Sequence, residues 1–90
     1  MSERISREEL VRIYNVEITF FDSLEEAGLL TTETEDDIKY LQYDDLSAFE
    51  KFTNWYYDLE VNLAGLEVIN HLLSQIEKMR RENERISKLI

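Results

Sequence analysis

The stretch VEITFFDSLEEAGLL, residues 16–30 of this 90-residue chain, decides the fold that the sequence predicts. Its apolar residues recur every three positions, so that one face of a helix would carry Ile18, Phe21, Leu24 and Ala27. Gly28 follows at once, and glycine most easily adopts the left-handed conformation that ends a helix. Leu29 and Leu30 can then fold back onto the last turn. We therefore predict a short helix with a sharp stop.

The polar face of the same helix carries acidic residues and no basic one: Glu17, Asp22, Glu25 and Glu26. Proteins gain affinity for nucleic acids largely by neutralising phosphates with lysine and arginine. This face therefore has the wrong sign of charge for binding DNA.

Composition limits the classes of protein to which the chain can belong. Ninety residues with 43% hydrophobic content favour one small folded domain. The absence of cysteine excludes a disulfide framework, a thiolate metal site and a thiol nucleophile. The first residues lead into no apolar run, and no stretch is apolar over the length of a membrane span. We therefore expect no signal peptide and no membrane segment, and a cytoplasmic location.

Charge is distributed unevenly along the chain, whose net charge is −10. Residues 1–62 hold 16 acidic and five basic residues, a balance of −11, whereas residues 63–90 hold four acidic and five basic ones. Two interpretations of the acidic part stay open: the carboxylates keep a small protein soluble, or they face a basic partner.

The segments on either side of the first stretch carry their own signals. SREE at residues 6–9 is a capping box, in which Ser6 accepts from the Glu9 amide and the Glu9 carboxylate reaches back to Ser6. It predicts a helix from about Arg7 to near Asn15. Polar residues 31–37, TTETEDD, and the β-prone run IKYLQY at 38–43 predict a short strand or hairpin with an open turn type.

A third helix is expected after Asp44 or Asp45, either of which can cap it. Its predicted apolar face comprises Leu46, Phe49, Phe52, Trp55, Tyr56 and Leu59. A break at residues 61–63 follows, with Asn62 as the cap of a last helix that runs from Leu63 to the end of the chain.

The last helix carries a heptad pattern, with apolar residues alternating in steps of three and four. The stripe comprises Ile69, Leu72, Ile76, Met79, Asn83, Ile86 and Ile90. Asn83 falls at an a position, where a buried amide commonly fixes register and oligomeric state. We expect these residues to form a coiled-coil homodimer; the alternative is a helix packed along its own domain.

In order and length, these elements resemble the MerR-like winged helix-turn-helix fold over nearly the whole chain. The resemblance implies a mainly α fold, with a winged helix-turn-helix head (residues 1–62), a small β wing and a long C-terminal helix (63–90). In that fold the second helix enters the DNA groove. DNA-binding relatives carry Arg-Thr-Leu-Arg-Tyr-Tyr on this helix, where residues 19–24 read TFFDSL. The wing has four acids where phosphate-binding arginines are expected: Glu33, Glu35, Asp36 and Asp37.

The chain more closely resembles the CbpM-type chaperone modulators, a branch of that fold. The matching segments are LQYDD at residues 41–45, YDLEVNLAGL at 57–66 and IEKMRRENE at 76–84. The resemblance implies binding to the J-domain of a DnaJ- or CbpA-like co-chaperone, and inhibition of its interactions with Hsp70 and DNA. J-domains present a basic helix to Hsp70. An acidic protein could bind that helix in competition with Hsp70.

The candidate partner-binding residues are the acids and aromatic residues Asp22, Glu25, Glu26, Tyr56, Tyr57 and Asp58. Three consecutive helix positions span about 200°, so one of Trp55, Tyr56 and Tyr57 must leave the core face. That ring is either incidentally exposed or part of the partner surface. The helix-face acids are equally open to interpretation as a solvated surface.

No set of residues predicts an enzyme, a metal site or a cofactor. His71 is the only histidine, and the chain has only two glycines and no phosphate-binding loop. Two further functions stay open beside the chaperone modulator. One is a MerR-like DNA-binding transcriptional regulator, which the acidic second helix and wing argue against. The other is a dimeric protein-interaction module that acts through the last helix.

Overall fold

Helix α1 (Arg7–Tyr14) begins and ends at the residues that the sequence predicts. The Ser6 hydroxyl accepts a hydrogen bond from the Glu9 amide at 3.2 Å, which satisfies a free donor of the first turn. Asn15 ends the helix in the left-handed conformation, with φ 55°. The predicted return hydrogen bond from the Ser6 amide to the Glu9 carboxylate is not formed. The Glu9 Oε1 instead lies 3.9 Å from an Arg12 guanidinium nitrogen, one helical turn further along.

Helix α2 (Ile18–Glu26) follows after a short turn and is rotated relative to its predicted face. Its buried residues are Phe20, Phe21 and Leu24, while Ile18 is 40% exposed. Burying the larger Phe20 removes more apolar surface from water than burying Ile18 would. The predicted stop is confirmed: Gly28 has φ 77°, and the Leu29 amide donates to the Leu24 carbonyl at 2.9 Å.

The acidic segment forms the predicted hairpin, the wing. Strands β2 (Thr32–Glu35) and β3 (Ile38–Gln42) pair antiparallel around Asp36 and Asp37, whose φ values are 52° and 64°. Positive φ at both central residues is the geometry of a type I′ turn, which matches the twist of the strands. A third strand, β1 (Arg4–Ser6), pairs with the other edge of β3, which gives the sheet order β1-β3-β2.

Helix α3 (Leu46–Thr53) follows a 3₁₀ turn, η1 (Tyr43–Asp45), and continues into a π-helical turn, η2 (Asn54–Asp58). Asp45 occupies the N-cap position of α3 without a side-chain hydrogen bond to the helix. In η2 the Leu59 amide donates to the Asn54 carbonyl, five residues back, at 3.2 Å. This wider turn shifts the helical register. It explains why Leu59, predicted on the apolar face, is 65% exposed.

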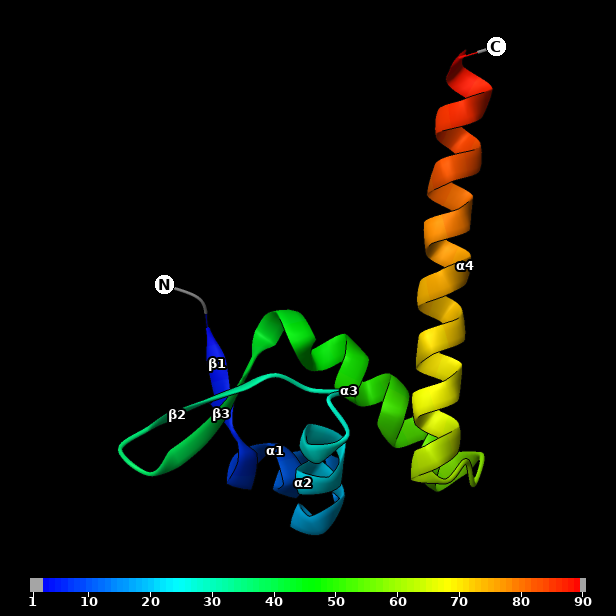
Figure 1. Ribbon diagram of the computed structural model, residues 1–90. Helices are drawn as coiled ribbons and strands as arrows, with labels where there is room; N and C mark the ends of the chain where they lie inside the picture. The colour runs from blue at the N-terminus through cyan, green and yellow to red at the C-terminus, as the bar shows by residue number, and fades with distance from the viewer. Residues whose placement is uncertain (1–2, 90) are drawn as a thin grey trace.

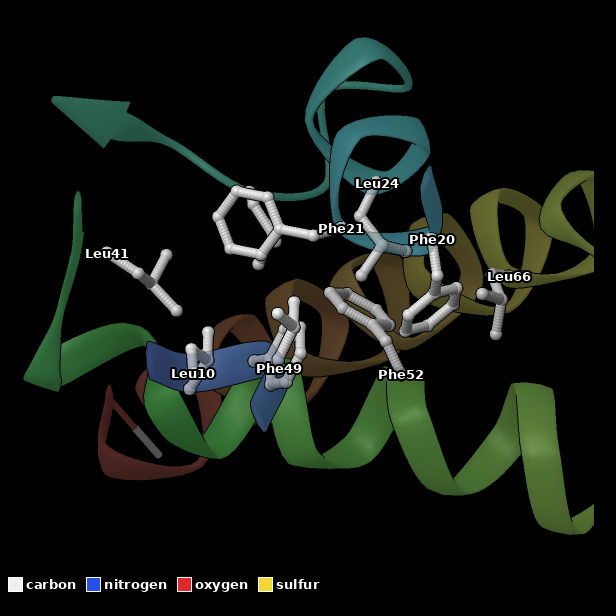
Figure 2. Close-up of a cluster of buried hydrophobic side chains, with 10 residues drawn as sticks. Leu10, Phe20, Phe21, Leu24, Leu41, Phe49, Phe52 and Leu66 are labelled. Carbon is white, nitrogen blue, oxygen red and sulfur yellow. The ribbon is translucent and has the colours of Figure 1, made fainter. Parts of the chain in front are cut away.

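The hydrophobic core lies where α1, α2 and α3 meet beneath the sheet (Figures 1 and 2). Figure 2 shows that Phe20 and Leu24 point from α2 toward α3, which carries Phe49 and Phe52, while Phe21 extends toward the side of Leu41. Phe21 and Phe49 lie with ring centroids 6.0 Å apart. The other buried apolar residues come from all parts of the head and from the base of the last helix: Leu10, Val11, Leu30, Leu41 and Leu66.

Helix α4 (Leu63–Leu89) projects from the head as a single long rod (Figure 1). Its start is confirmed, because the Asn62 side-chain oxygen accepts from the Gly65 amide at 2.8 Å. Within its described span only Leu66 is buried, so α4 does not pack along its own domain. The structure, a computed structural model, describes residues 3–89, and Ile90, the last member of the predicted stripe, lies outside them. Within that range no helix combines the length and apolar character needed to cross a bilayer.

Candidate partner-binding surface

The acids of α2 differ in what their carboxylates contact. Asp22 is half-buried and accepts a hydrogen bond from an Arg7 guanidinium nitrogen of α1 at 2.9 Å. Glu25 is half-buried and accepts from the Lys39 ammonium of β3 and from the Thr32 hydroxyl of β2. Glu26 is exposed. Of the three predicted acids, two therefore stabilise the head from within, and Glu26 points its charge to solvent.

The Glu25 carboxylate is held in its ionised form. Hydrogen bonds from Lys39 first, and from Thr32 second, lower the pKa of Glu25 from its ordinary value of 4.5. Both donors come from the wing, and hydrogen bonds to an ionised group favour that form. Glu25 therefore fastens the wing to α2.

The aromatic residues of η2 lie against the first turn of α2. The rings of Phe20 and Tyr56 are tilted by 33° with centroids 4.6 Å apart, and Tyr57 stands at 72° to Phe20, 5.2 Å away. The Tyr57 hydroxyl accepts from the backbone amide of Glu17, at the N-cap of α2, at 3.4 Å. One of the three consecutive rings Trp55, Tyr56 and Tyr57 was expected to leave the core face. That ring is Tyr57, which is 42% exposed.

A hollow of about 200 Å³ lies between the first turn of α2 and the η2 turn; we call it the aromatic hollow. Its lining includes the three rings just described together with one carboxylate, two hydroxyls and an aliphatic side chain. These residues are Glu17, Thr19, Phe20, Ser23, Tyr56, Tyr57 and Leu63. Asp58, the last residue of η2, is exposed but does not line the hollow.

The predicted site residues thus fall on two sides of α2. Asp22 and Glu25 face α1 and the wing, whereas Tyr56 and Tyr57 meet the first turn of α2. Five lining residues were not predicted as site residues: Glu17, Thr19, Phe20, Ser23 and Leu63. The π-helical turn that brings the tyrosines to this part of α2 leaves no pattern in the sequence.

The predicted dimerisation residues form an exposed stripe on α4. Leu72, Ile76, Met79 and Ile86 are each at least half exposed, Asn83 is exposed, and Ile69 is half-buried near the head. The stripe is therefore available to a partner.

The arrangement of α1, a short turn, α2 and a β wing is that of a winged helix-turn-helix. The family model described as MerR HTH family regulatory protein matches residues 5–88. The chain belongs to the MerR family of helix-turn-helix regulators. No curated protein and no solved structure matches the chain significantly.

In this MerR family member, α2 and the wing are the elements whose counterparts would meet DNA. Helix α2 contains no lysine or arginine, and the only basic residue of β2 and β3 is Lys39, which pairs with Glu25. Arg4 likewise binds the wing, with its guanidinium 2.8 Å from a Glu35 oxygen. Lys39 and Arg4 therefore pair with acids of the protein itself.

Within the described residues, the same surface holds no cluster typical of a metal site. Over residues 3–89, no three histidine or acidic side chains gather closely enough to hold a metal ion. His71 is exposed on α4, 3.3 Å from the Gln75 amide nitrogen. The carboxylates and aromatic rings of the head are groups that can bind a partner.

Proposed function

We propose that this MerR family member is a non-catalytic regulator that binds the J-domain of a DnaJ- or CbpA-like co-chaperone and inhibits its interactions with Hsp70 and DNA. The observation that carries the proposal is the charge of α2 and the wing, where exposed acids stand in place of phosphate-binding residues. Glu26 and the hairpin tip, Asp36 and Asp37, all face solvent. A basic helix of a J-domain is the complementary surface.

Charge and aromatic rings would contribute differently to this interface. Complementary charges mainly raise the association rate and make binding sensitive to salt. Tyrosines are typical anchors that carry affinity at protein interfaces. In the proposed complex the acids Glu26 and Asp58 steer the partner, and Tyr56 and Tyr57 contribute the contact energy.

We also propose that two copies associate through α4. Its exposed apolar residues follow the alternating three-and-four spacing of a coiled coil, and a second copy offers an identical stripe. The regulator would then be a homodimer with two acidic heads.

A calorimetric titration with a purified J-domain, at low and at physiological salt, tests the proposal. We expect saturable binding that weakens as salt rises. Replacing Asp22 or Glu25 would break internal ion pairs, so Glu26→Lys combined with Asp58→Lys is the sharper variant. It should weaken binding and flatten the salt dependence. Glu84→Lys, an exposed acid on α4, is the control for a lysine substitution away from the head and should bind like wild type.

Two results would contradict the proposal: wild type that does not bind the J-domain, or a doubly substituted head that binds as well as wild type. If the double variant binds the J-domain as well as wild type, and the isolated peptide of residues 63–90 also binds it, the interaction module that acts through α4 would be favoured.

DNA binding is the second candidate, because the MerR family match favours it. It predicts measurable affinity for duplex DNA with a steep salt slope, since affinity would come from displaced counterions. A duplex titration under the two salt conditions distinguishes this candidate from the first. The charge of α2 and the wing leads us to expect no such affinity.

A further inference from the structure

We propose that the aromatic hollow binds one cationic side chain, a lysine or arginine, from a basic protein partner. The proposal deepens the function above and rests on it for the identity of the partner. The hollow itself is a property of this chain, built where η2 meets the first turn of α2.

Aromatic rings supply the first part of the recognition. Phe20 and Tyr56 are tilted by 33° relative to each other, while Tyr57 stands at steep angles to both, 72° to Phe20 and 76° to Tyr56. The hollow is thus lined by aromatic rings that differ in orientation. Aromatic faces attract cations through the negative charge of the ring, which contributes roughly 0.5–2 kcal/mol depending on desolvation. Lysine and arginine also carry apolar stems that pack well against such walls.

Charge supplies the second part. Glu17 is the only charged residue that lines the hollow, and its exposed carboxylate has no basic partner in the lining. The Thr19 hydroxyl lies 3.3 Å from a Glu17 carboxylate oxygen, which holds that carboxylate near the hollow. A cation can form an ion pair with this carboxylate, whereas a purely apolar side chain cannot.

Size supplies the third part. Pockets that bind drug-sized molecules generally have volumes of roughly 300–1,000 Å³. At about 200 Å³ the aromatic hollow is smaller than those sites. Its scale suits the end of a single side chain. The hollow therefore acts as an anchor point within a larger protein interface.

The first experiment uses small probes on the full-length, isotopically labelled chain. N-acetyl-lysine amide and N-acetyl-arginine amide should shift the backbone NMR signals of residues 17–23 and 56–57, whereas N-acetyl-norleucine amide, which lacks the cation, should not. Glu17→Gln should abolish the shifts, and Glu84→Gln, which removes one acid far from the hollow, should preserve them. Equal shifts with norleucine, or none with any probe, would overturn the proposal.

The second experiment uses the purified J-domain as probe. Glu17→Gln and Tyr56→Leu should each weaken J-domain binding by roughly three- to tenfold, since loss of a cation–aromatic or ionic contact has about that effect. Circular dichroism and thermal unfolding of each variant establish that it is folded.

The two experiments separate the failure of each proposal. Undiminished J-domain binding by folded Glu17→Gln and Tyr56→Leu overturns the cation site and leaves the proposed function standing. Absent J-domain binding by wild type, with lysine and arginine shifts intact, overturns the proposed function and supports the cation site.

Discussion

Glu25 is the residue at which three elements of the head meet. It belongs to α2, pairs with Lys39 of β3, and accepts a hydrogen bond from Thr32 of β2. Both ionic side chains are about three-quarters buried, so solvent screens their interaction less than that of an exposed pair. A single carboxylate thus couples the position of the wing to α2.

The lowered pKa of Glu25 predicts how the stability of the head depends on pH. Because the folded state favours the carboxylate, its contribution is present above the unfolded pKa and is lost as pH falls through the lowered folded value. We expect Glu25→Gln to reduce the free energy of unfolding by about 1 kcal/mol at neutral pH. The difference from wild type should shrink as the solution is acidified below about pH 4.5.

Chemical unfolding at a series of pH values measures that difference. Glu26→Gln, its exposed neighbour, is the matched control and should follow the wild-type profile. A Glu25→Gln deficit that stays constant with pH would show that the carboxylate charge is not what stabilises the wing.

At the scale of the elements, Gly28 permits the sharp exit from α2. Its φ of 77° lies in the left-handed region, and a Cβ built on it would meet nothing within 4 Å. A substitution there therefore strains the backbone without a steric clash. Gly28→Ala should destabilise the head by roughly 1–2 kcal/mol, because a Cβ disfavours this conformation.

Gly28→Asn provides the comparison, since asparagine visits the left-handed region more readily. In urea unfolding it should lose less stability than Gly28→Ala. If alanine were tolerated as well as asparagine, the φ of residue 28 would not limit the end of α2.

The same elements show what a sequence can and cannot predict. Helix ends at Ser6, Gly28 and Asn62 were predictable because a cap depends on residues a few positions apart. Strand β1 was not, because three residues carry no pattern and its partner β3 lies more than thirty positions away. Burial of Phe20 in place of Ile18 depends on contacts with α3 and η2, which only the folded chain makes.

Some features of the candidate surface could likewise be predicted from the sequence, and others could not. The acidic character of α2 and the wing could be read from the sequence, and so could the departure of one η2 ring from the core. The ion pairs of Asp22 and Glu25 could not, because Arg7 and Lys39 reach them from other elements. The aromatic hollow also depends on the π-helical turn.

At the scale of the whole molecule, the exposed stripe of α4 predicts the oligomeric state. Wild type should sediment as a dimer, because the apolar stripe is otherwise left in water. Leu72→Asp combined with Ile76→Asp would place carboxylates in the coiled-coil contact and should yield a folded monomer. His71→Asp adds an acid to α4 off the stripe and should remain dimeric. Wild type that sediments as a monomer at all concentrations tested would refute the prediction.

The projection of α4 from the head also separates charge along the molecule, whose longest extent is 52 Å. Residues 1–62 carry −11, whereas the five basic residues of α4 all lie in its second half: Lys78, Arg80, Arg81, Arg85 and Lys88. Each single chain therefore has an electric dipole along its length. In the field of a positively charged protein it would experience a torque that turns the head forward. The chain would thus approach the positively charged protein with its head first, before any side chains of the two proteins make contact.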